Sequence, residues 1–310
     1  MAKSIREVYG AVLTEMGAEN KDIVVLDADL SGSTKTAGFG KAYPDRFFNM
    51  GIAESNMVAT AAGLSTTGKI PFVNTFTVFL TTLGLISTRG QVCYGNLNVK
   101  YGGAYCGMSD ALDGATHHAT EDIAVMRSLP NMRVIVPSDA TYTRWATYKA
   151  AELQGPVYLR LSRDVYPDLY AEDAKFELGK GVVMKDGKDV TIVATGLMVN
   201  EALEAAKALE ADGISARVVN IHTIKPLDKE LICKCAKETG LIVTAEEHSI
   251  IGGLGSAVAE AVTECCPVPV VKIGVNDEFG HSGPAVDLLK EFGLSAENIA
   301  NKTKEAVKNK

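Results

Sequence analysis

The stretch Arg46 to Met57, R-F-F-N-M-G-I-A-E-S-N-M, places a single acid between two segments with different residue patterns. The apolar residues after Arg46 indicate a short strand that continues through Ile52. The following small residues recur at helical spacing and predict a helix from Ala53 to Leu64. Glu54 is therefore expected at a helix N-terminus with an apolar wall on one side. An isolated acid there usually complements the helix dipole, so this segment alone favours a structural role.

Composition restricts the class of protein to which the rest of the chain belongs. A chain of 310 residues is long enough for two domains, and 46% hydrophobic with 22% charged residues is typical of a globular protein. The net charge of −7 weighs against a nucleic-acid-binding surface. Asn and Thr interrupt the longest apolar run, I-P-F-V-N-T-F-T-V-F-L-T-T-L-G-L-I, which does not predict a membrane span. The N-terminus has a helix pattern without the apolar core of a signal peptide.

Six cysteines occur, at positions 93, 106, 233, 235, 265 and 266. They show no C-x-x-C spacing, and no histidines flank them at the spacing of a zinc site. We therefore expect mostly buried, reduced thiols in a cytoplasmic protein, and no metal site on this chain.

Strand and helix patterns alternate in both halves of the chain, which predicts an α/β fold with two doubly wound domains. The expected domains are residues 1–170 and 183–310, joined by a polar linker at 171–182. Strands are expected at 23–26, 70–73, 97–101, 133–136, 157–161, 190–194, 216–221, 241–245 and 268–273. Helices are expected at 5–16, 77–91, 121–128, 139–154, 198–212 and 228–239, with a further helix that begins in the turn I-G-G-L-G and runs to residue 263.

Two polar segments follow predicted strands of the first half. One is the turn D-A-D-L-S-G-S-T after the strand 23–26, and the other is the loop Y-G-G-A-Y-C-G-M-S-D-A-L-D-G-A-T-H-H. Ligands of open parallel sheets bind beyond the carboxyl ends of the strands, which favours a ligand at both segments. For the first turn, an Asx-turn with a helix cap explains the pattern equally well. The later I-G-G-L-G is not the dinucleotide-binding G-x-G-x-x-G pattern.

Several motifs in a fixed order resemble the transketolase family of thiamine-diphosphate enzymes. They are D-A-D-L-S, R-F-F-N-M-G-I-A-E, N-T-F-T-V-F, L-D-G-A-T-H-H and L-S-R, with the flanking phrases M-R-S-L-P-N-M-R-V-I-V-P-S-D-A and T-A-E-E-H-S-I-I-G-G-L-G. The resemblance covers essentially the whole chain. It corresponds to the C-terminal half of a full-length transketolase, which comprises the pyrimidine-binding domain and the C-terminal domain.

The resemblance implies a cofactor site for the pyrimidine half of thiamine diphosphate. Glu54 matches the family glutamate that hydrogen-bonds the pyrimidine nitrogen, so that the cofactor's own amino group can take the proton from its reactive carbon. Burial in apolar surroundings suits such an acid because it favours proton sharing. Phe76 and Phe79 match the aromatic pair on which the pyrimidine stacks, although core packing would explain them without the other motifs.

The resemblance also implies contacts with a sugar phosphate substrate. His117 matches a catalytic position near the aminopyrimidine and the transferred two-carbon unit. Asp113 matches an acid near a sugar hydroxyl, and Arg163 matches an arginine that grips the phosphate. Arg6 and Ser33 align with two further phosphate contacts in a weaker sequence context. Two other histidines, at positions 248 and 281, are expected to be structural.

Three departures from the family pattern qualify this interpretation. Tyr105 stands where transketolases carry a phosphate-contacting histidine, which leaves the identity of the sugars open. The helix that usually contains D-Q-I-R reads L-I-S-T from Leu85 to Thr88. The chain also lacks the G-D-G motif through which these enzymes bind the cofactor's diphosphate with Mg²⁺.

The sequence therefore predicts the pyrimidine-side subunit of a split transketolase. A second polypeptide would supply the diphosphate and Mg²⁺ site, with the cofactor at the interface of an α2β2 assembly. Three alternatives stay open: the beta subunit of a 2-oxoacid dehydrogenase first component, a relative of 1-deoxyxylulose-5-phosphate synthase, and a non-catalytic partner subunit. The D-G-x-x-H turn and the L-S-R arginine favour the sugar enzyme over the first of these.

Overall fold

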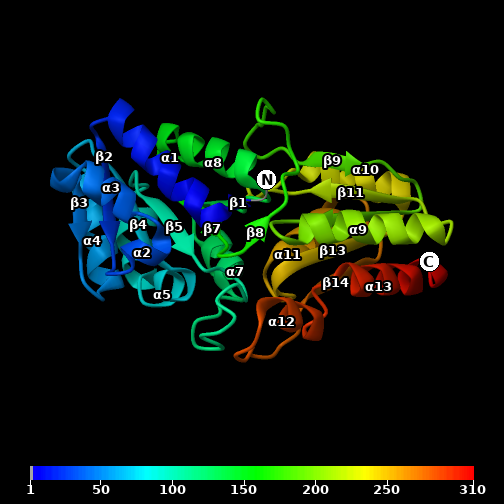
Figure 1. The fold of residues 1–310 in the computed structure, drawn as a ribbon. Coiled ribbons are helices and arrows are strands. Elements are labelled where there is room, and N and C mark those ends of the chain that lie inside the picture. The colour runs from blue at the N-terminus through cyan, green and yellow to red at the C-terminus, as the bar shows by residue number, and fades with distance from the viewer. Residues whose placement is uncertain (1–2) are drawn as a thin grey trace.

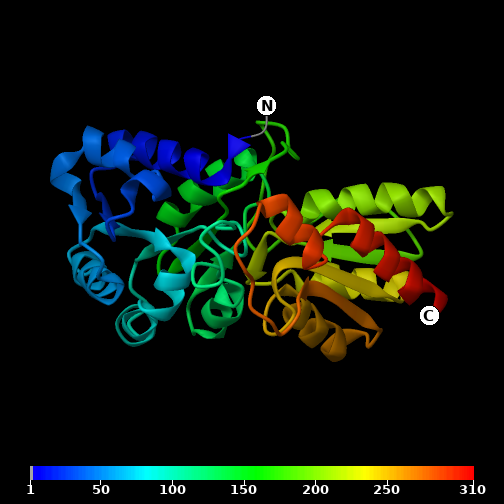
Figure 2. The same cartoon turned by 60° about the horizontal axis from the view of Figure 1, so that its bottom comes forward.

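Two twisted β-sheets, one in each half of the chain, organise the computed structural model, which describes residues 3–310. Figure 1 shows the N-terminal half on the left and the C-terminal half on the right, with helices on the faces of each sheet. The two halves also lie side by side in the rotated view of Figure 2. The predicted α/β class with two sheets is confirmed. The domain boundaries at residues 170 and 183 stay a prediction.

The first sheet has seven strands in the order β12-β6-β7-β5-β4-β2-β3, and every neighbouring pair is parallel except β12 with β6. Every residue of β2 and β7 is buried, as expected for a parallel sheet covered on both faces. The strands are β2 (Ile23–Asp27), β3 (Phe47–Asn49), β4 (Ile70–Phe76), β5 (Lys100–Ala104), β6 (Arg133–Ile135), β7 (Val157–Leu161) and β12 (Thr223–Lys225).

Helices cover both faces of this sheet because successive strand residues point to opposite sides. Ile23 and Val25 of β2 join a core with α1 (Ile5–Glu19) and α8 (Ala140–Glu152). Val24 and Leu26 join the opposite core with α4 (Glu54–Ser65) and α7 (Asp122–Ser128).

The remaining elements of this half are α2 (Ser31–Thr34), α3 (Ala37–Ala42), the 3-10 turn η1 (Pro44–Arg46), α5 (Thr77–Thr82), α6 (Leu85–Ser87), the π-helical η2 (Thr88–Cys93), and the short pair β1 (Lys3–Ser4) and β8 (Val165–Tyr166).

The second sheet has five strands in the order β14-β13-β10-β11-β9, with only the edge strand β9 antiparallel. Its strands are β9 (Val182–Lys185), β10 (Val190–Ala194), β11 (Ala216–Asn220), β13 (Ile242–Ser249) and β14 (Val270–Val275). Asp228 and Ser295 accept hydrogen bonds from backbone N–H groups as N-caps of two of the helices. The helices are α9 (Met198–Ala211), α10 (Lys229–Thr239), α11 (Leu254–Cys265), α12 (Ala285–Glu291) and α13 (Ala296–Lys308).

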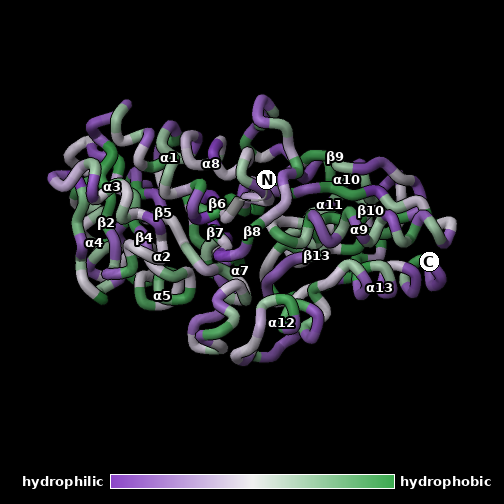
Figure 3. The backbone as a smooth tube through the Cα atoms, in the orientation of Figure 1, coloured by the Kyte–Doolittle hydropathy of each residue, from purple (hydrophilic) through white to green (hydrophobic). Residues whose placement is uncertain are grey.

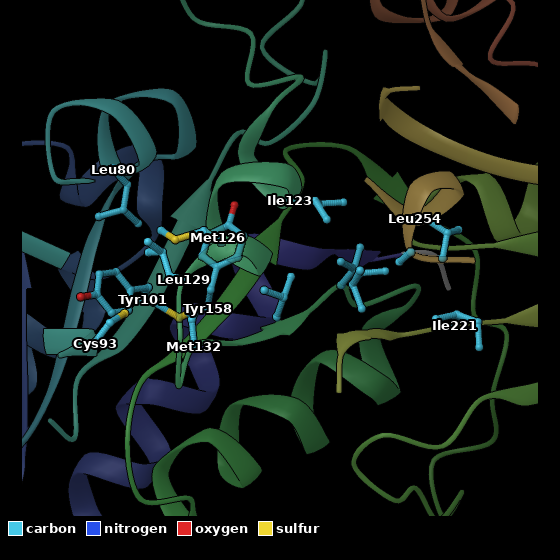
Figure 4. Close-up of a cluster of buried hydrophobic side chains, with 14 of the residues drawn as sticks. Leu80, Cys93, Tyr101, Ile123, Met126, Leu129, Met132, Tyr158, Ile221 and Leu254 are labelled. Atoms are coloured by element: carbon cyan, nitrogen blue, oxygen red, sulfur yellow. The ribbon is translucent and has the colours of Figure 1, made fainter. Parts of the chain in front are cut away.

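The two halves share a continuous interface. Strand β12 lies after β11 in the chain, yet it pairs with β6 at the edge of the first sheet. The buried cluster in Figure 4 runs from Tyr101 and Tyr158 of the first sheet through Ile123 to Ile221 and Leu254 of the second half. Figure 3 shows hydrophobic and hydrophilic residues alternating along helices such as α9, as expected for helices with one buried face. The halves are therefore packed against each other through both backbone pairing and apolar contact.

Several predicted elements differ from the structure in extent. Strand β3 ends at Asn49, so the prediction that it continues through Ile52 was wrong: Gly51 has φ +69°, which ends the extended conformation. Ile52, between β3 and α4, is 83% exposed. The helix predicted at 77–91 is divided into α5, α6 and η2 around Gly84, in a Thr-rich segment of low helix propensity.

The strand predicted at 97–101 begins three residues later and includes two glycines. A Cβ at Gly102 or Gly103 would overlap the rings of Tyr9 and Tyr158, which pack closely against β5. Glycines in a strand often mark such a close approach of neighbouring groups. A sequence pattern of Gly-Gly instead suggests a loop, which is why the prediction stopped at residue 101.

The expectation that the thiols are reduced was wrong for one pair. Cys233 and Cys265 form a disulfide, with Cα atoms 6.0 Å apart. The bond joins α10 to the end of α11, which pack against each other, and a sequence separation of 32 gave no sign of this contact. The other four cysteines are free, and three of them are buried. Within residues 3–310, no helix is long and apolar enough to cross a membrane.

Candidate functional site

The predicted site residues gather at the carboxyl edge of the first sheet. Phe76 is the last residue of β4, Tyr105 follows β5 directly, and Arg163 lies two residues after β7. Glu54 follows β3 after a short turn. Since these strands are parallel neighbours, their ends meet at one edge, where the ligands of such sheets bind.

Glu54 is the first residue of α4 and is only 3% exposed. Its Oε1 accepts a long hydrogen bond from Thr75 Oγ1 at 3.3 Å, and Thr75 directly precedes Phe76 in β4. The predicted helix N-terminus is therefore confirmed. One weak partner leaves this buried carboxyl group with hydrogen-bonding capacity for a ligand.

An aromatic cluster begins at Phe76, the residue after the Thr75 partner of Glu54. The rings of Phe76 and Phe79 are 6.0 Å apart with an interplanar angle of 22°. His117 presents an edge to both, with ring centroids 6.1 Å from Phe76 and 5.4 Å from Phe79. Tyr105 packs on the other side of Phe76, with centroids 4.3 Å apart. The structure thus brings both predicted phenylalanines together with the predicted histidine.

Two arginines flank the Tyr105 ring. Arg6 Nη1 donates to Tyr105 Oη at 2.7 Å and to the backbone oxygen of Ser33 at 2.8 Å. The guanidinium carbons of Arg6 and Arg163 lie 4.9 Å and 5.3 Å from the Tyr105 ring centroid. Arg6, Ser33 and Arg163, which were predicted as substrate contacts, are therefore parts of one cluster, and their cationic groups suit an anion.

A pair of acids lies next to these cations. Asp110 is fully buried, and its Oδ1 accepts a hydrogen bond from Arg163 Nη1 at 3.3 Å. Burial, together with the charge and hydrogen bond of Asp113, raises the pKa of Asp110 to about 6, while Arg163 and His117 oppose the shift. Asp113 is exposed in the following turn. This end of the site therefore offers both hydrogen-bond donors and acceptors to a polyol phosphate.

Asp27, the last residue of β2, has a structural role in the turn that follows the strand. Asp27 is buried and accepts hydrogen bonds from Leu30 N, Thr34 Oγ1 and Thr36 Oγ1 at 2.6–2.8 Å. These bonds give Asp27 a structural role in holding the turn, although the backbone bond reaches three residues on rather than the two of an Asx-turn, and α2 begins without a side-chain cap. Its link to the site is the backbone oxygen of Ser33, which orients Arg6.

Comparison with known families decides the assignment. The profile of the transketolase pyrimidine-binding domain matches residues 1–168, and that of the transketolase C-terminal domain matches residues 179–299. The chain belongs to the transketolase family.

Relatives of similar length are transketolase subunits. A "Putative transketolase C-terminal section" from Methanocaldococcus jannaschii is 48% identical over 99% of this chain and 97% of its own length. The "6-deoxy-6-sulfo-D-fructose transketolase subunit SqwH" of Clostridium sp. is 42% identical over 99% of this chain and 95% of its own length. Against the mouse transketolase, at 37% identity, this chain spans 49% of that protein. The chain is therefore assigned in general terms as a subunit in a family of transferases.

A solved structure agrees in fold and length. A protein described as "Split gene transketolase, inactive beta4 tetramer" superposes with a TM-score of 0.90 at 52% identity and covers 99% of both chains. Transketolase from Campylobacter jejuni, at 21% identity, has the same fold with a TM-score of 0.82 over 47% of its chain.

The residues present fit the pyrimidine half of the family cofactor. A buried carboxyl group with one weak partner, and an aromatic pair that begins at the residue after that partner, suit a flat, nitrogen-containing ring. Among residues 3–310, no group of three or more His, Cys, Asp or Glu is arranged to hold a metal ion. The histidines expected to be structural make local contacts, at His248 Nε2 with Ala124 N–H and at His281 Nε2 with Glu291.

Sequence reasoning missed two residues of this cluster. Asp110 lies in the Gly-rich loop, three residues before the predicted Asp113, and it was not singled out. Tyr105 was recognised only as a departure, whereas the structure places it in contact with Phe76 and both arginines. The sequence signal for Asp110 was a charged residue in a Gly-rich loop after a buried strand.

Proposed function

We propose that this chain is the pyrimidine-side subunit of a split transketolase. It transfers a two-carbon ketol unit from a ketose phosphate to an aldose through thiamine diphosphate. The main support is the buried Glu54 beside the Phe76–Phe79 pair in a chain that contains no G-D-G motif. A partner chain supplies the site for the diphosphate and Mg²⁺, as in the family's N-terminal domain.

Glu54 and the aromatic cluster act on the cofactor in this proposal. Glu54 hydrogen-bonds the pyrimidine nitrogen, and Phe76 with Phe79 holds the ring by stacking. The bound cofactor supplies a nucleophilic carbon that carries the two-carbon unit. His117 exchanges a proton with the transferred unit in this proposal, which its contact with both phenylalanines supports.

The polar end of the site binds the substrate in this proposal. Arg6 and Arg163 provide cationic donors for the phosphate, and Ser33 orients Arg6 through its backbone oxygen. Asp113 accepts a hydrogen bond from a sugar hydroxyl. Tyr105, which lies between the arginines and Phe76, sets the distance between the phosphate and the reacting carbon.

Exposed apolar residues support an interface next to the site. Ile52, Leu83, Ile86 and Tyr94 are 83%, 56%, 70% and 91% exposed, and they lie on or beside elements that pack around α4. Such side chains favour a protein contact over exposure to water. We infer that the diphosphate-binding chain covers this region in a cytoplasmic α2β2 assembly.

A mixing experiment tests the split-subunit proposal. The purified chain is assayed with thiamine diphosphate, Mg²⁺ and fructose 6-phosphate, alone and with the candidate partner chain encoded beside it. We expect no ketol transfer from either chain alone and full activity from the pair. Full activity of this chain alone would refute the proposal.

A donor screen on the reconstituted pair tests the substrate class. The panel contains fructose 6-phosphate, 6-deoxy-6-sulfofructose and pyruvate, because the names of relatives include a sulfosugar transketolase. We expect turnover of ketose donors with an anionic end. Turnover of pyruvate alone would instead assign a 2-oxoacid decarboxylase component.

A further inference from the structure

The inner side of the Gly-rich loop 105–118 is held by the C-terminal half of the chain. Met108 and Ala111 are buried in the core of the second sheet. Gly283, in the segment before α12, donates its N–H to Ala111 O at 3.1 Å. In Figure 1 the loop lies between α7 and α12. The position of the loop, which also carries Asp113 and His117, therefore depends on residues outside the first sheet.

Glu247 of β13 contacts the backbone of this loop directly. Its Oε1 accepts a hydrogen bond from Met108 N–H at 2.8 Å. Gly107 next to it has φ +59°, and a Cβ at that position would lie 2.5 Å from the carboxyl carbon of Glu247. The close approach thus requires a glycine at 107. Glu247 is 2% exposed, and water does not compete for this contact.

Arg160 of β7 holds the backbone of Glu247 from the other side. Its Nη2 donates to Glu247 O at 2.9 Å, while Nε and Nη2 also donate to Asp122 at 2.8 Å and 3.1 Å. Asp122 further accepts from Tyr158 Oη at 2.6 Å. Arg160 Nη1 also lies 4.0 Å from Glu247 Oε2, but the closer Asp122 still neutralises Arg160 when the Glu247 carboxyl group is replaced.

The same loop segment carries the contacts of the proposed substrate residues. Ser109 Oγ accepts from Arg163 N–H at 3.3 Å, Asp110 binds the Arg163 guanidinium at 3.3 Å, and Asp113 N–H donates to Asp110 O at 3.2 Å. A shift of residues 107–110 would therefore move Arg163 and Asp113 together. Glu54 and the phenylalanine pair lie on α4, β4 and α5, outside residues 107–110.

We propose that Glu247 is a positioning residue: it fixes the Gly-rich loop through Met108 N–H, and thereby the substrate contacts Asp113 and Arg163. The C-terminal half thus contributes to substrate binding without touching the substrate. This inference rests on the proposed function for its kinetic consequence, but the contact itself can be tested without activity.

The test compares Glu247→Met with Glu247→Gln. Met has similar length and cannot accept the hydrogen bond, whereas Gln keeps an acceptor oxygen. Loss of a buried acceptor should speed hydrogen exchange at Met108 N–H by roughly tenfold or more in Glu247→Met, and Glu247→Gln should restore slow exchange. In the reconstituted pair, Glu247→Met should raise KM for fructose 6-phosphate by roughly tenfold while the Kd for thiamine diphosphate stays the same.

Glu246→Met is the matched control on the same strand. Glu246 is equally buried but faces α11, where it accepts from Leu254 N–H and Gly255 N–H at 2.6 Å and 2.8 Å. This control should lower Tm without changing Met108 exchange or KM. The proposal is overturned if Glu247→Met leaves exchange and KM unchanged, or if both Met variants have the same effects.

Two further measurements distinguish failure of the Glu247 contact from failure of the proposed function. If Glu247→Met does not fold, hydrogen exchange in the wild-type chain still tests the proposed contact. Fast exchange at Met108 N–H would overturn it. If the wild-type pair turns over no ketose, the proposed function fails, whereas slow Met108 exchange that requires an acceptor at 247 still supports the positioning role.

Discussion

Tyr105 connects the two chemical environments of the site. Its ring contacts Phe76, and the guanidinium groups of both Arg6 and Arg163 lie over it. Its backbone has φ +59°, which is uncommon for an aromatic residue and is found most often where function maintains it. The strained backbone supports a role of Tyr105 in substrate selection, at the position where transketolases carry histidine.

Substitution of Glu54 tests the cofactor assignment at the residue scale. In the reconstituted pair, Glu54→Ala should lower kcat by about a hundredfold or more, because proton transfer through the cofactor loses its partner. Initial rates with saturating thiamine diphosphate measure this loss. Tm should change little, since the Thr75 hydrogen bond is long.

Ser55→Ala is the matched control for Glu54. Ser55 lies on the same turn of α4, and its hydroxyl group contacts Ser87 at 3.0 Å. Its loss should leave kcat close to that of wild type. A Glu54→Ala variant with the same kcat as Ser55→Ala would contradict the assignment.

At the scale of elements, the disulfide joins two helices of the second domain. Cys233 lies in α10 and Cys265 ends α11, and the two helices also pack through apolar side chains of the shared core. The bond therefore restrains the unfolded chain more than it changes the packed helices.

Thiol counting and a Cys233→Ser variant test this bond. Under denaturing conditions without reductant, four of the six cysteines should react, because two are paired. Cys233→Ser should lower the free energy of unfolding by about 3 kcal/mol under oxidising conditions. Cys266→Ser, which leaves the pair intact, is the control. Six reactive thiols in the wild-type chain would show that the bond does not form.

At the scale of the whole molecule, a buried polar network connects the two domains. Arg160 and Asp122 come from the first half, and Glu247 comes from the second. Burial raises the pKa of Glu247 to about 8; Asp164 and Asp122 add to this shift, and Arg160 and Met108 N–H oppose it. Cys106 and Tyr166 are the other titratable groups that interact with this carboxyl group.

The raised pKa of Glu247 predicts a contribution to the free energy of unfolding that falls as the pH rises. The folded chain retains a proton on Glu247 that the unfolded chain releases between its own pKa of about 4.3 and the folded value. Stability should therefore fall through this window, by up to about 1.4 kcal/mol per pH unit from this group, and level off above pH about 8.

Denaturation at several pH values, compared between wild type and Glu247→Gln, measures this contribution. The difference between the two proteins isolates Glu247 from other titrating groups such as Asp110. The variant should lose less stability than wild type between about pH 5 and pH 8. Parallel pH profiles of the two proteins would contradict the raised pKa.

Much of the architecture could be predicted from local patterns. A continuous apolar run correctly indicated β2, and small residues at helical spacing correctly indicated α4 with Glu54 at its start. The predictions failed where packing decides the conformation. Gly102 and Gly103 lie in a strand, where the side chains of Tyr9 and Tyr158 occupy the space that a Cβ would need. No local sequence pattern contains that information.

The sequence by itself determined the family, the α/β class and the order of the site motifs, because these depend on residue identity and on spacing along the chain. The tertiary structure decided which distant side chains meet. It brought Arg6 and Arg163 to the Tyr105 ring, paired Cys233 with Cys265, and brought Glu247 to Met108 N–H. Such contacts join residues up to 139 positions apart, and they arise only when the sheets have formed and packed together.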